Sequence, residues 1–114
     1  NSPSSDPVIV WFSGAPGCSA LLACFHENGP FIFYPGKVTF TPNENSWNKK
    51  ASVLYLEMPL GTGFSYGGSS KPDRITDETF TTEFMYVIRL FFERFPAYKK
   101  CDFYLSGHGY GAVN

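Results

Sequence analysis

Three short, mostly apolar runs constrain the fold of this chain more than any other feature. They span residues 7–12, 52–57 and 101–106, and proline, glycine or turn residues bound them. Continuous apolar runs of this length are typical of strands buried on both faces of a parallel sheet. Because the second and third runs are separated by a long helical pattern, the order of elements predicts an α/β fold with mostly parallel strands and flanking helices.

Residues 77–94 carry the clearest helical pattern. Six apolar side chains fall at helical spacing and form one stripe: Phe80, Phe84, Val87, Ile88, Phe91 and Phe92. Thr76 or Asp77 is suited to cap the start, and acidic residues in the first turn suit the helix dipole. Pro96 lies just beyond the end. We therefore predict a helix over 77–94 whose apolar stripe packs into the core.

The segments between these elements are rich in small and turn-forming residues. Residues 13–19 predict a loop, and residues 20–25 a short helix that Asn-Gly-Pro at 28–30 would stop. Residues 31–40 alternate loosely, which fits either a short hairpin or an extended loop. Residues 61–71 predict a glycine- and serine-rich loop.

Composition excludes several classes of partner. The formal net charge of −1 gives no basic field for nucleic acid, and no apolar run approaches the roughly 18 residues of a membrane span. Cys24 and His26 are close, but no second ligand pair supports a zinc site, so we expect neither metal nor cofactor. Residues 1–6 lack the features of a signal peptide. The odd cysteine count leaves at least one thiol unpaired or paired outside this chain.

The third apolar run leads into the turn Gly107-His108-Gly109-Tyr110-Gly111. A strand followed by Gly-x-Ser-x-Gly is the nucleophile elbow, in which a tight turn lifts the central side chain toward a histidine base. Here the centre is Gly109, which has no side chain to act as nucleophile or proton donor. His108 beside it points elsewhere in an elbow and does not replace the lost hydroxyl.

Two other interpretations of this turn remain open at the level of sequence. Gly107, Gly109 and Ala112 also satisfy the dinucleotide pattern G-x-G-x-x-G/A, although that pattern usually follows the first strand of its sheet. The acidic residue expected about 20 positions further on would fall beyond Asn114. The third interpretation is a plain glycine turn without chemistry.

Six segments of the chain, in order, match known signatures. They are residues 10–19 (V-W-F-S-G-A-P-G-C-S), 27–31 (E-N-G-P-F), 45–48 (N-S-W-N), 59–66 (P-L-G-T-G-F-S-Y), 91–98 (F-F-E-R-F-P-A-Y) and 104–111 (Y-L-S-G-H-G-Y-G). Together they resemble the serine carboxypeptidases, peptidase family S10, whose fold is the α/β-hydrolase. The resemblance covers nearly the whole chain. It implies that residues 1–114 are part of one α/β-hydrolase domain, with a truncated sheet.

The resemblance also implies roles for residues around the glycine turn. Gly109 stands at the position of the serine nucleophile, and the family's triad Asp and His would lie beyond Asn114. The oxyanion hole would be formed by the backbone N–H groups of Ala15 and Tyr110, which survive side-chain changes. The alternative is that the loop around Ala15 only packs its small residues against the turn.

A second implied site binds the C-terminal carboxylate of a peptide. The family uses an Asn-Gly pair and two Glu side chains, and the matching positions are Ser13, Gly14, Glu27 and His108. An acid beside a carboxylate must be protonated, so such a site works best in acid. A protonated His108 would pair with a carboxylate directly, but we favour relaxed constraint on an inactive site. Glu27 fits a solvated loop residue equally well.

Further residues match the family with weaker implications. Thr62, Phe64 and Tyr66 correspond to a loop that helps line the substrate cleft, although the two aromatics fit simple core packing nearly as well. Cys18 matches a family cysteine that forms a disulfide with a later segment, so its partner would lie outside this chain.

The expected protein is therefore serine carboxypeptidase-like and catalytically inactive as written. By resemblance its partner is a peptide C-terminus and its location is the secretory pathway, in a lysosome or vacuole or outside the cell. The alternatives are a non-catalytic binding or structural protein and a non-functional gene fragment. We also expect open sheet edges and poor solubility for this segment alone.

Overall fold

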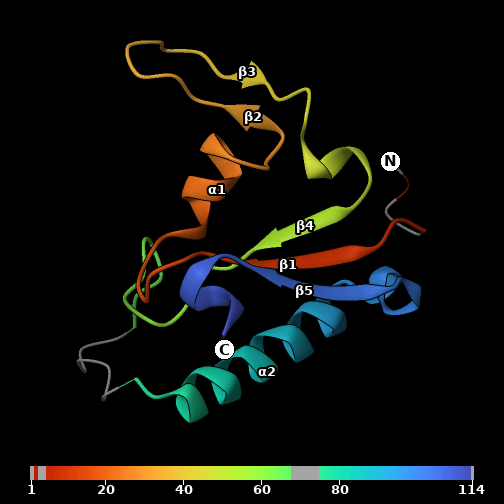
Figure 1. Cartoon of the computed structure of the whole chain (residues 1–114). Helices are drawn as coiled ribbons and strands as arrows, with labels where there is room; N and C mark the ends of the chain where they lie inside the picture. The colour runs from red at the N-terminus through yellow and green to blue at the C-terminus, as the bar shows by residue number, and fades with distance from the viewer. Residues whose placement is uncertain (1, 3–4, 68–74, 114) are drawn as a thin grey trace.

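The structure is a computed structural model that describes residues 2, 5–67 and 75–113, so residues 68–71 of the expected glycine- and serine-rich loop lie outside it. Its centre is a parallel sheet in the order β4-β1-β5. Helices α1 and α2 lie on opposite faces of this sheet (Figure 1). The bounds are β1 Val8–Phe12, α1 Ala20–His26, β2 Phe31–Ile32, β3 Thr41–Pro42, η1 Trp47–Lys49, β4 Ser52–Tyr55, α2 Asp77–Arg94, η2 Pro96–Lys100, β5 Phe103–Gly107 and η3 Gly109–Ala112. The predicted α/β class is confirmed.

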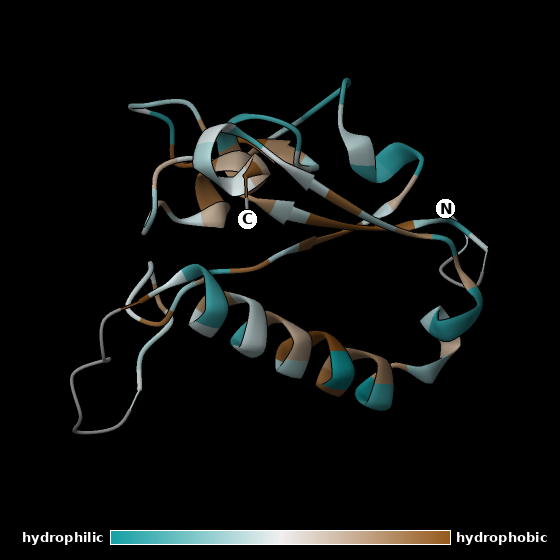
Figure 2. Cartoon of the chain, turned by 60° about the horizontal axis from the view of Figure 1, so that its bottom comes forward, coloured by the Kyte–Doolittle hydropathy of each residue, from teal (hydrophilic) through white to brown (hydrophobic). Residues whose placement is uncertain are grey.

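Strand β1 is the buried centre of the sheet, as its apolar run predicts. Val10 and Phe12 project toward α2 and form a core cluster with Phe84 and Ile88 of that helix. The Phe12 ring meets the Phe84 ring edge-on, with centroids 5.1 Å apart. Figure 2 shows hydrophobic residues along the strands and recurring along α2 between hydrophilic ones. Burying such side chains contributes about 1.5–3 kcal/mol each, which makes this interface the main source of cohesion.

Helix α2 has the predicted bounds, and its start is fixed by a capping box. The Thr76 hydroxyl accepts a hydrogen bond from the Thr79 N–H, and the Thr79 hydroxyl accepts one from the Thr76 N–H. Asp77 and Glu78 occupy the first turn, where their charge favours the positive end of the helix dipole. The helix therefore begins at a defined place, where Thr76 and Asp77 line the same cavity as Met58 and Pro59 of the loop after β4.

The outer strands differ from the expectation of strands buried on both faces. All four residues of β4 are only half-buried, and on β5 Tyr104 and Leu105 are 54% and 56% exposed. The reason is position, because each has a hydrogen-bonding neighbour only on the β1 side. Strand β5 also begins at Phe103 rather than at residue 101, since Cys101 terminates the preceding 3-10 helix η2.

The excursion between β1 and β4 covers the other face. Ser19 caps α1 by accepting a hydrogen bond from the Leu21 N–H at 3.2 Å. Strands β2 and β3 then pair in antiparallel fashion through two residues each, so that residues 33–40, the larger part of the segment 31–40, form the loop between the two strands. On the same face the Trp11 ring packs edge-on against the Trp47 ring of η1, with centroids 5.3 Å apart.

Candidate active site

The parallel sheet brings three loops to one edge. Phe12 of β1 pairs with Gly107 of β5, and Trp11 pairs with Tyr55 of β4, so the three strands end at nearly the same level. The loops that follow them, residues 13–19, 56–66 and 108–111, therefore meet at the carboxyl edge of the sheet (Figure 1). In open parallel sheets this edge is where ligands bind.

The glycine turn after β5 has the geometry of an elbow. His108 still pairs with β1, because its N–H donates to the Phe12 carbonyl at 3.1 Å, and the chain then turns sharply at Gly109, where φ is +57°. A Cβ on Gly111 would lie 2.5 Å from the Ser13 carbonyl oxygen. A Cβ on Gly107 would likewise overlap the Gly111 carbonyl group. The turn therefore requires small residues two positions before and two positions after Gly109, as an elbow does.

Among the three glycines of this turn, Gly109 alone has room for a side chain. A Cβ built there would meet the Gly14 Cα at 3.5 Å, an ordinary van der Waals distance. Glycine adopts this positive φ freely, whereas a residue with a side chain would be strained there, as residues at many active sites are. The elbow is thus formed and directed at the loop after β1, but its tip carries only hydrogen.

The loop after β1 presents a free donor near this tip. A turn closed by the Cys18 N–H on the Ala15 carbonyl at 2.9 Å shapes the loop, and Gly17 adopts φ +84°. Among the described residues no hydrogen bond uses the Ala15 N–H. The Tyr110 N–H lies in the first turn of the 3-10 helix η3, where amide donors have no partner within the helix. Both donors are thus unpaired, as an oxyanion hole requires.

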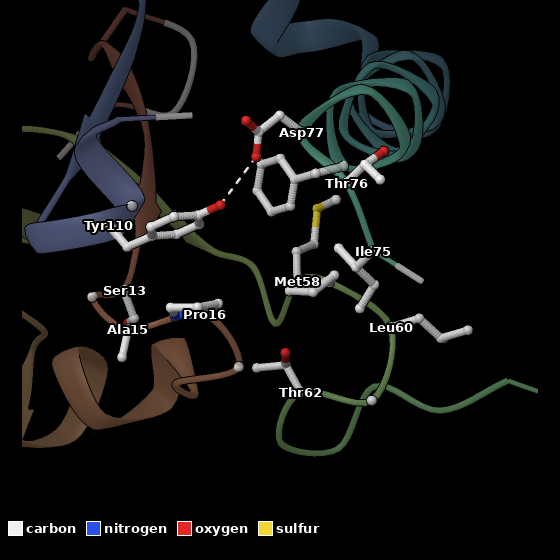
Figure 3. A pocket seen from close by; sticks show the side chains of 16 residues that line it. Ser13, Ala15, Pro16, Met58, Leu60, Thr62, Ile75, Thr76, Asp77 and Tyr110 are labelled. Atoms are coloured by element: carbon white, nitrogen blue, oxygen red, sulfur yellow. Dashed lines mark hydrogen bonds between the residues drawn. The ribbon is translucent and has the colours of Figure 1, made fainter. Parts of the chain in front are cut away.

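A cavity of about 410 Å³ lies between the loops and the start of α2. Its walls are mostly apolar, with polar groups at the ends (Figure 3). The lining residues are Ser13, Gly14, Ala15, Pro16, Gly17, Met58, Pro59, Leu60, Gly61, Thr62, Ile75, Thr76, Asp77, Phe80, Tyr110 and Gly111. An apolar cavity with a few convergent polar groups is the usual form of a small-ligand site.

The structure brings together some of the predicted site residues and separates others. Ser13, Gly14, Ala15, Thr62 and Tyr110 all line this cavity, and Gly109 adjoins it through Gly14. Thr62 is 2% exposed, which makes it the most buried polar side chain of the set.

The remaining predicted residues lie outside the cavity lining. Phe64 and Tyr66 are 81% and 90% exposed, so neither is a core aromatic. His108 lies against Gly14, where its Nδ1 would be 3.1 Å from an added Cβ. Glu27 is exposed at the end of α1, and its carbonyl accepts a hydrogen bond from the Asn43 side chain at 3.0 Å.

The sequence did not reveal a link between the elbow and α2. The Tyr110 hydroxyl donates to the Asp77 Oδ1 at 3.0 Å across the cavity (Figure 3). Asp77 was singled out only as a helix-capping candidate, and nothing in the sequence pairs it with a residue 33 positions later. The hydrogen bond to the Asp77 carboxylate raises the pKa of Tyr110, because it stabilises the protonated phenol. The side chain next to Gly109 is therefore held against the start of α2.

A network of polar side chains next to Glu27 was also not predicted from the sequence. The Tyr55 hydroxyl donates to the Asn28 Oδ1 at 2.9 Å, and Asn28 is buried. Burial raises the pKa of Tyr55 strongly, with further contributions from Cys24 and Glu27. Burial also raises the pKa of the Cys24 thiol. Within the described part of the chain, the buried Trp11 Nε1 and Asn28 Nδ2 donors have no partner.

Two further observations concern metal ions and membranes. In residues 2, 5–67 and 75–113 no cluster of three His, Cys, Asp or Glu side chains is arranged to hold a metal ion. Across the same residues, none of the helices has the length and apolar character needed to cross a membrane.

Comparison with known proteins identifies the family. The sequence model described as serine carboxypeptidase matches residues 1–113. Serine carboxypeptidase S10 family member 1 of Dictyostelium discoideum is 43% identical over 110 residues, which are 96% of this chain and 26% of that protein. Carboxypeptidase Y homolog A of Arthroderma otae is 41% identical over 96% of this chain and 20% of its own length. The lysosomal protective protein of Mus musculus is 40% identical over 99% of this chain and 24% of its own length.

The chain therefore spans between a fifth and about a quarter of these relatives. The family match includes both the turn after β5 and the small-residue loop after β1. The chain belongs to the serine carboxypeptidase family.

Proposed function

We propose that this chain is a serine carboxypeptidase-like protein that forms no acyl-enzyme. The observation that carries the proposal is Gly109 at the tip of the elbow, with φ +57° and space beyond it but no side chain. A serine there would supply the oxygen that attacks the scissile carbonyl, and a histidine would take its proton. Glycine has no atom for either step. Without the nucleophile, binding and the oxyanion hole alone accelerate hydrolysis by only about 10³–10⁴-fold over water.

A second function, recognition of a peptide C-terminus without cleavage, is favoured by what remains of the site. The cavity is flanked by the unpaired N–H groups of Ala15 and Tyr110, which suit a carbonyl or carboxylate oxygen. Its walls of Met58, Leu60 and Phe80 suit an apolar side chain of the peptide. We infer a lysosomal, vacuolar or extracellular location, a view that the name of the mouse relative supports.

The test compares the complete protein that carries this segment with its Gly109→Ser variant. Release of the C-terminal amino acid from an N-blocked apolar dipeptide is followed by chromatography. We expect no initial burst from the natural protein and no release beyond the residual acceleration from binding and the oxyanion hole. The proposal is wrong if the natural protein turns over the dipeptide with an initial burst, which is the sign of an accumulating covalent intermediate.

Calorimetry with the same dipeptide separates the remaining alternatives. The C-terminal amide of the dipeptide is the matched control, because it keeps the side chains and removes the charge. Binding of the acid but not of the amide supports a peptide-binding protein. Binding of neither favours a non-functional gene product.

A further inference from the structure

Glu57 lies where two loops of the cavity meet, and the proposed function assigns it no role. It follows the end of β4 and is half-buried between the loops of residues 13–19 and 59–66. One carboxylate oxygen, Oε2, accepts the Phe64 N–H at 2.7 Å. The other, Oε1, accepts a hydrogen bond from the Ser19 hydroxyl. Both oxygens of one side chain are therefore bound to donors on different loops.

Ser19 makes the first of these loops rigid at its base. Its hydroxyl accepts the Leu21 N–H at 3.2 Å as the cap of α1, which leaves its hydrogen for Glu57. Its carbonyl accepts a hydrogen bond from the Ser13 hydroxyl at 3.3 Å, which joins the first and last residues of the loop. The segment that bears the Ala15 N–H is thus tied at both ends, and Glu57 is its connection to the other side of the cleft.

The second loop is shaped around the same carboxylate. Gly63 has φ +54°, and a Cβ on it would overlap the Glu57 carboxylate. Only glycine lets the chain wrap this closely, so that the Phe64 N–H reaches Oε2. In the described part of the chain Glu57 makes no ion pair, so its charge is compensated by these hydrogen bonds rather than by a cation.

We propose that Glu57 is a positioning residue that sets the separation of the two walls of the cavity. Ala15 and Gly17 on one wall and Leu60 and Thr62 on the other belong to the two loops that Glu57 joins. When the Glu57 side chain is removed, the distance between the Ala15 N–H and the apolar wall is no longer fixed. The ligand-binding part of this inference rests on the proposed peptide recognition, whereas the joining of the loops does not.

The test uses the complete protein with Glu57→Gln, which keeps the shape of the side chain and removes its charge. A charge-assisted hydrogen bond is about twice as strong as a neutral one, so we expect the Phe64 amide to exchange with solvent on the order of 10-fold faster or more. We expect the affinity for the N-blocked dipeptide to fall by a similar factor. Glu57→Asp, which restores a carboxylate, should give values between those of Glu57→Gln and the natural protein.

Two further variants separate positioning from a general loss of stability. Ser19→Ala combined with Glu57→Gln should weaken dipeptide binding no more than the larger single effect, because both act on one link. Glu44→Gln is the matched control, since Glu44 is an exposed acid paired with Lys49, and it should change neither readout.

Unchanged Phe64 exchange in Glu57→Gln would overturn the joining of the loops. Unchanged affinity despite faster exchange would overturn the link to the cavity. If the natural protein binds no dipeptide, peptide recognition fails and with it the link to the cavity, while the exchange measurement still decides the joining of the loops.

Discussion

Replacing Gly109 or Gly111 by alanine, one at a time, tests the assignment of the turn as an elbow. In Gly109→Ala the new Cβ would meet the Gly14 Cα at 3.5 Å, so the cost is conformational rather than steric. A left-handed residue costs about 1–2 kcal/mol, and the reduced freedom of the unfolded chain returns about 0.4–1 kcal/mol. We therefore expect Gly109→Ala to lower the free energy of unfolding by only about 1 kcal/mol.

Gly111→Ala should be far more damaging. Its Cβ would lie 2.5 Å from the Ser13 carbonyl oxygen and 2.8 Å from the Phe12 carbonyl oxygen, both backbone atoms that cannot rotate away. Relief requires the end of β1 to move by close to an ångström, at the expense of the hydrogen bond from the His108 N–H to Phe12. Overpacking costs about 1–3 kcal/mol and the lost hydrogen bond about 1 kcal/mol more, so we expect a loss of about 3 kcal/mol or greater.

Urea unfolding of the complete protein, followed by tryptophan fluorescence, measures both variants. At unchanged slope, the shift in midpoint gives the change in unfolding free energy directly. The elbow geometry predicts that Gly111→Ala is destabilised more than Gly109→Ala by about 2 kcal/mol, from the magnitudes above. Equal losses, or a larger loss at Gly109, would refute the reasoning that Gly109 has room for a side chain and Gly111 does not.

Three further outcomes follow from the fold. Phe84→Ala, which removes a core side chain that is 8% exposed, should cost about 3–5 kcal/mol, whereas Met85→Ala, at 56% exposed, should stay within about 0.5 kcal/mol; thermal unfolding compares the two. Burial raises the pKa of Tyr55 above its ordinary value of 10.0, so the contribution of the Tyr55 phenol to stability is complete below pH 10.0 and declines as pH rises above it. Tyr55→Phe should therefore reduce the loss of unfolding free energy at alkaline pH, as measured by urea titrations between about pH 9 and 12. Residues 1–114 expressed alone should self-associate through β5, where Tyr104 and Leu105 are more than half exposed, and light scattering would show a monomer if this is wrong.

The sequence predicted the central elements well, because their signals are local. The apolar stripe and caps of α2 specify its bounds, and the continuous run of β1 predicted a buried strand, which the structure confirms. Burial of the outer strands was overestimated, since the composition of β5 does not show that one of its edges lacks a neighbour. Whether a strand is central depends on what pairs with it, which is a property of the whole sheet.

The candidate site was predictable only where motifs carried it. The glycine pattern predicted the elbow, and the family resemblance predicted a role for the loop of Ala15; the structure brings the two loops to the same edge of the sheet. The Asp77–Tyr110 and Ser19–Glu57 hydrogen bonds join residues 33 and 38 positions apart, and no spacing rule predicts such pairs. The sequence also did not predict that Phe64 and Tyr66 are exposed to solvent, because an aromatic residue in a glycine-rich loop has the same sequence signal whether it is packed or exposed.

The most direct measurement of the central claim is covalent labelling of the complete protein with a fluorophosphonate, read by peptide mass spectrometry. This reagent reacts with a serine only when a neighbouring base activates its hydroxyl. We predict that no peptide from residues 1–114 gains the mass of the reagent, because Gly109 presents no hydroxyl at the elbow. An adduct on any residue of this segment would contradict the account and show that a different side chain serves as nucleophile.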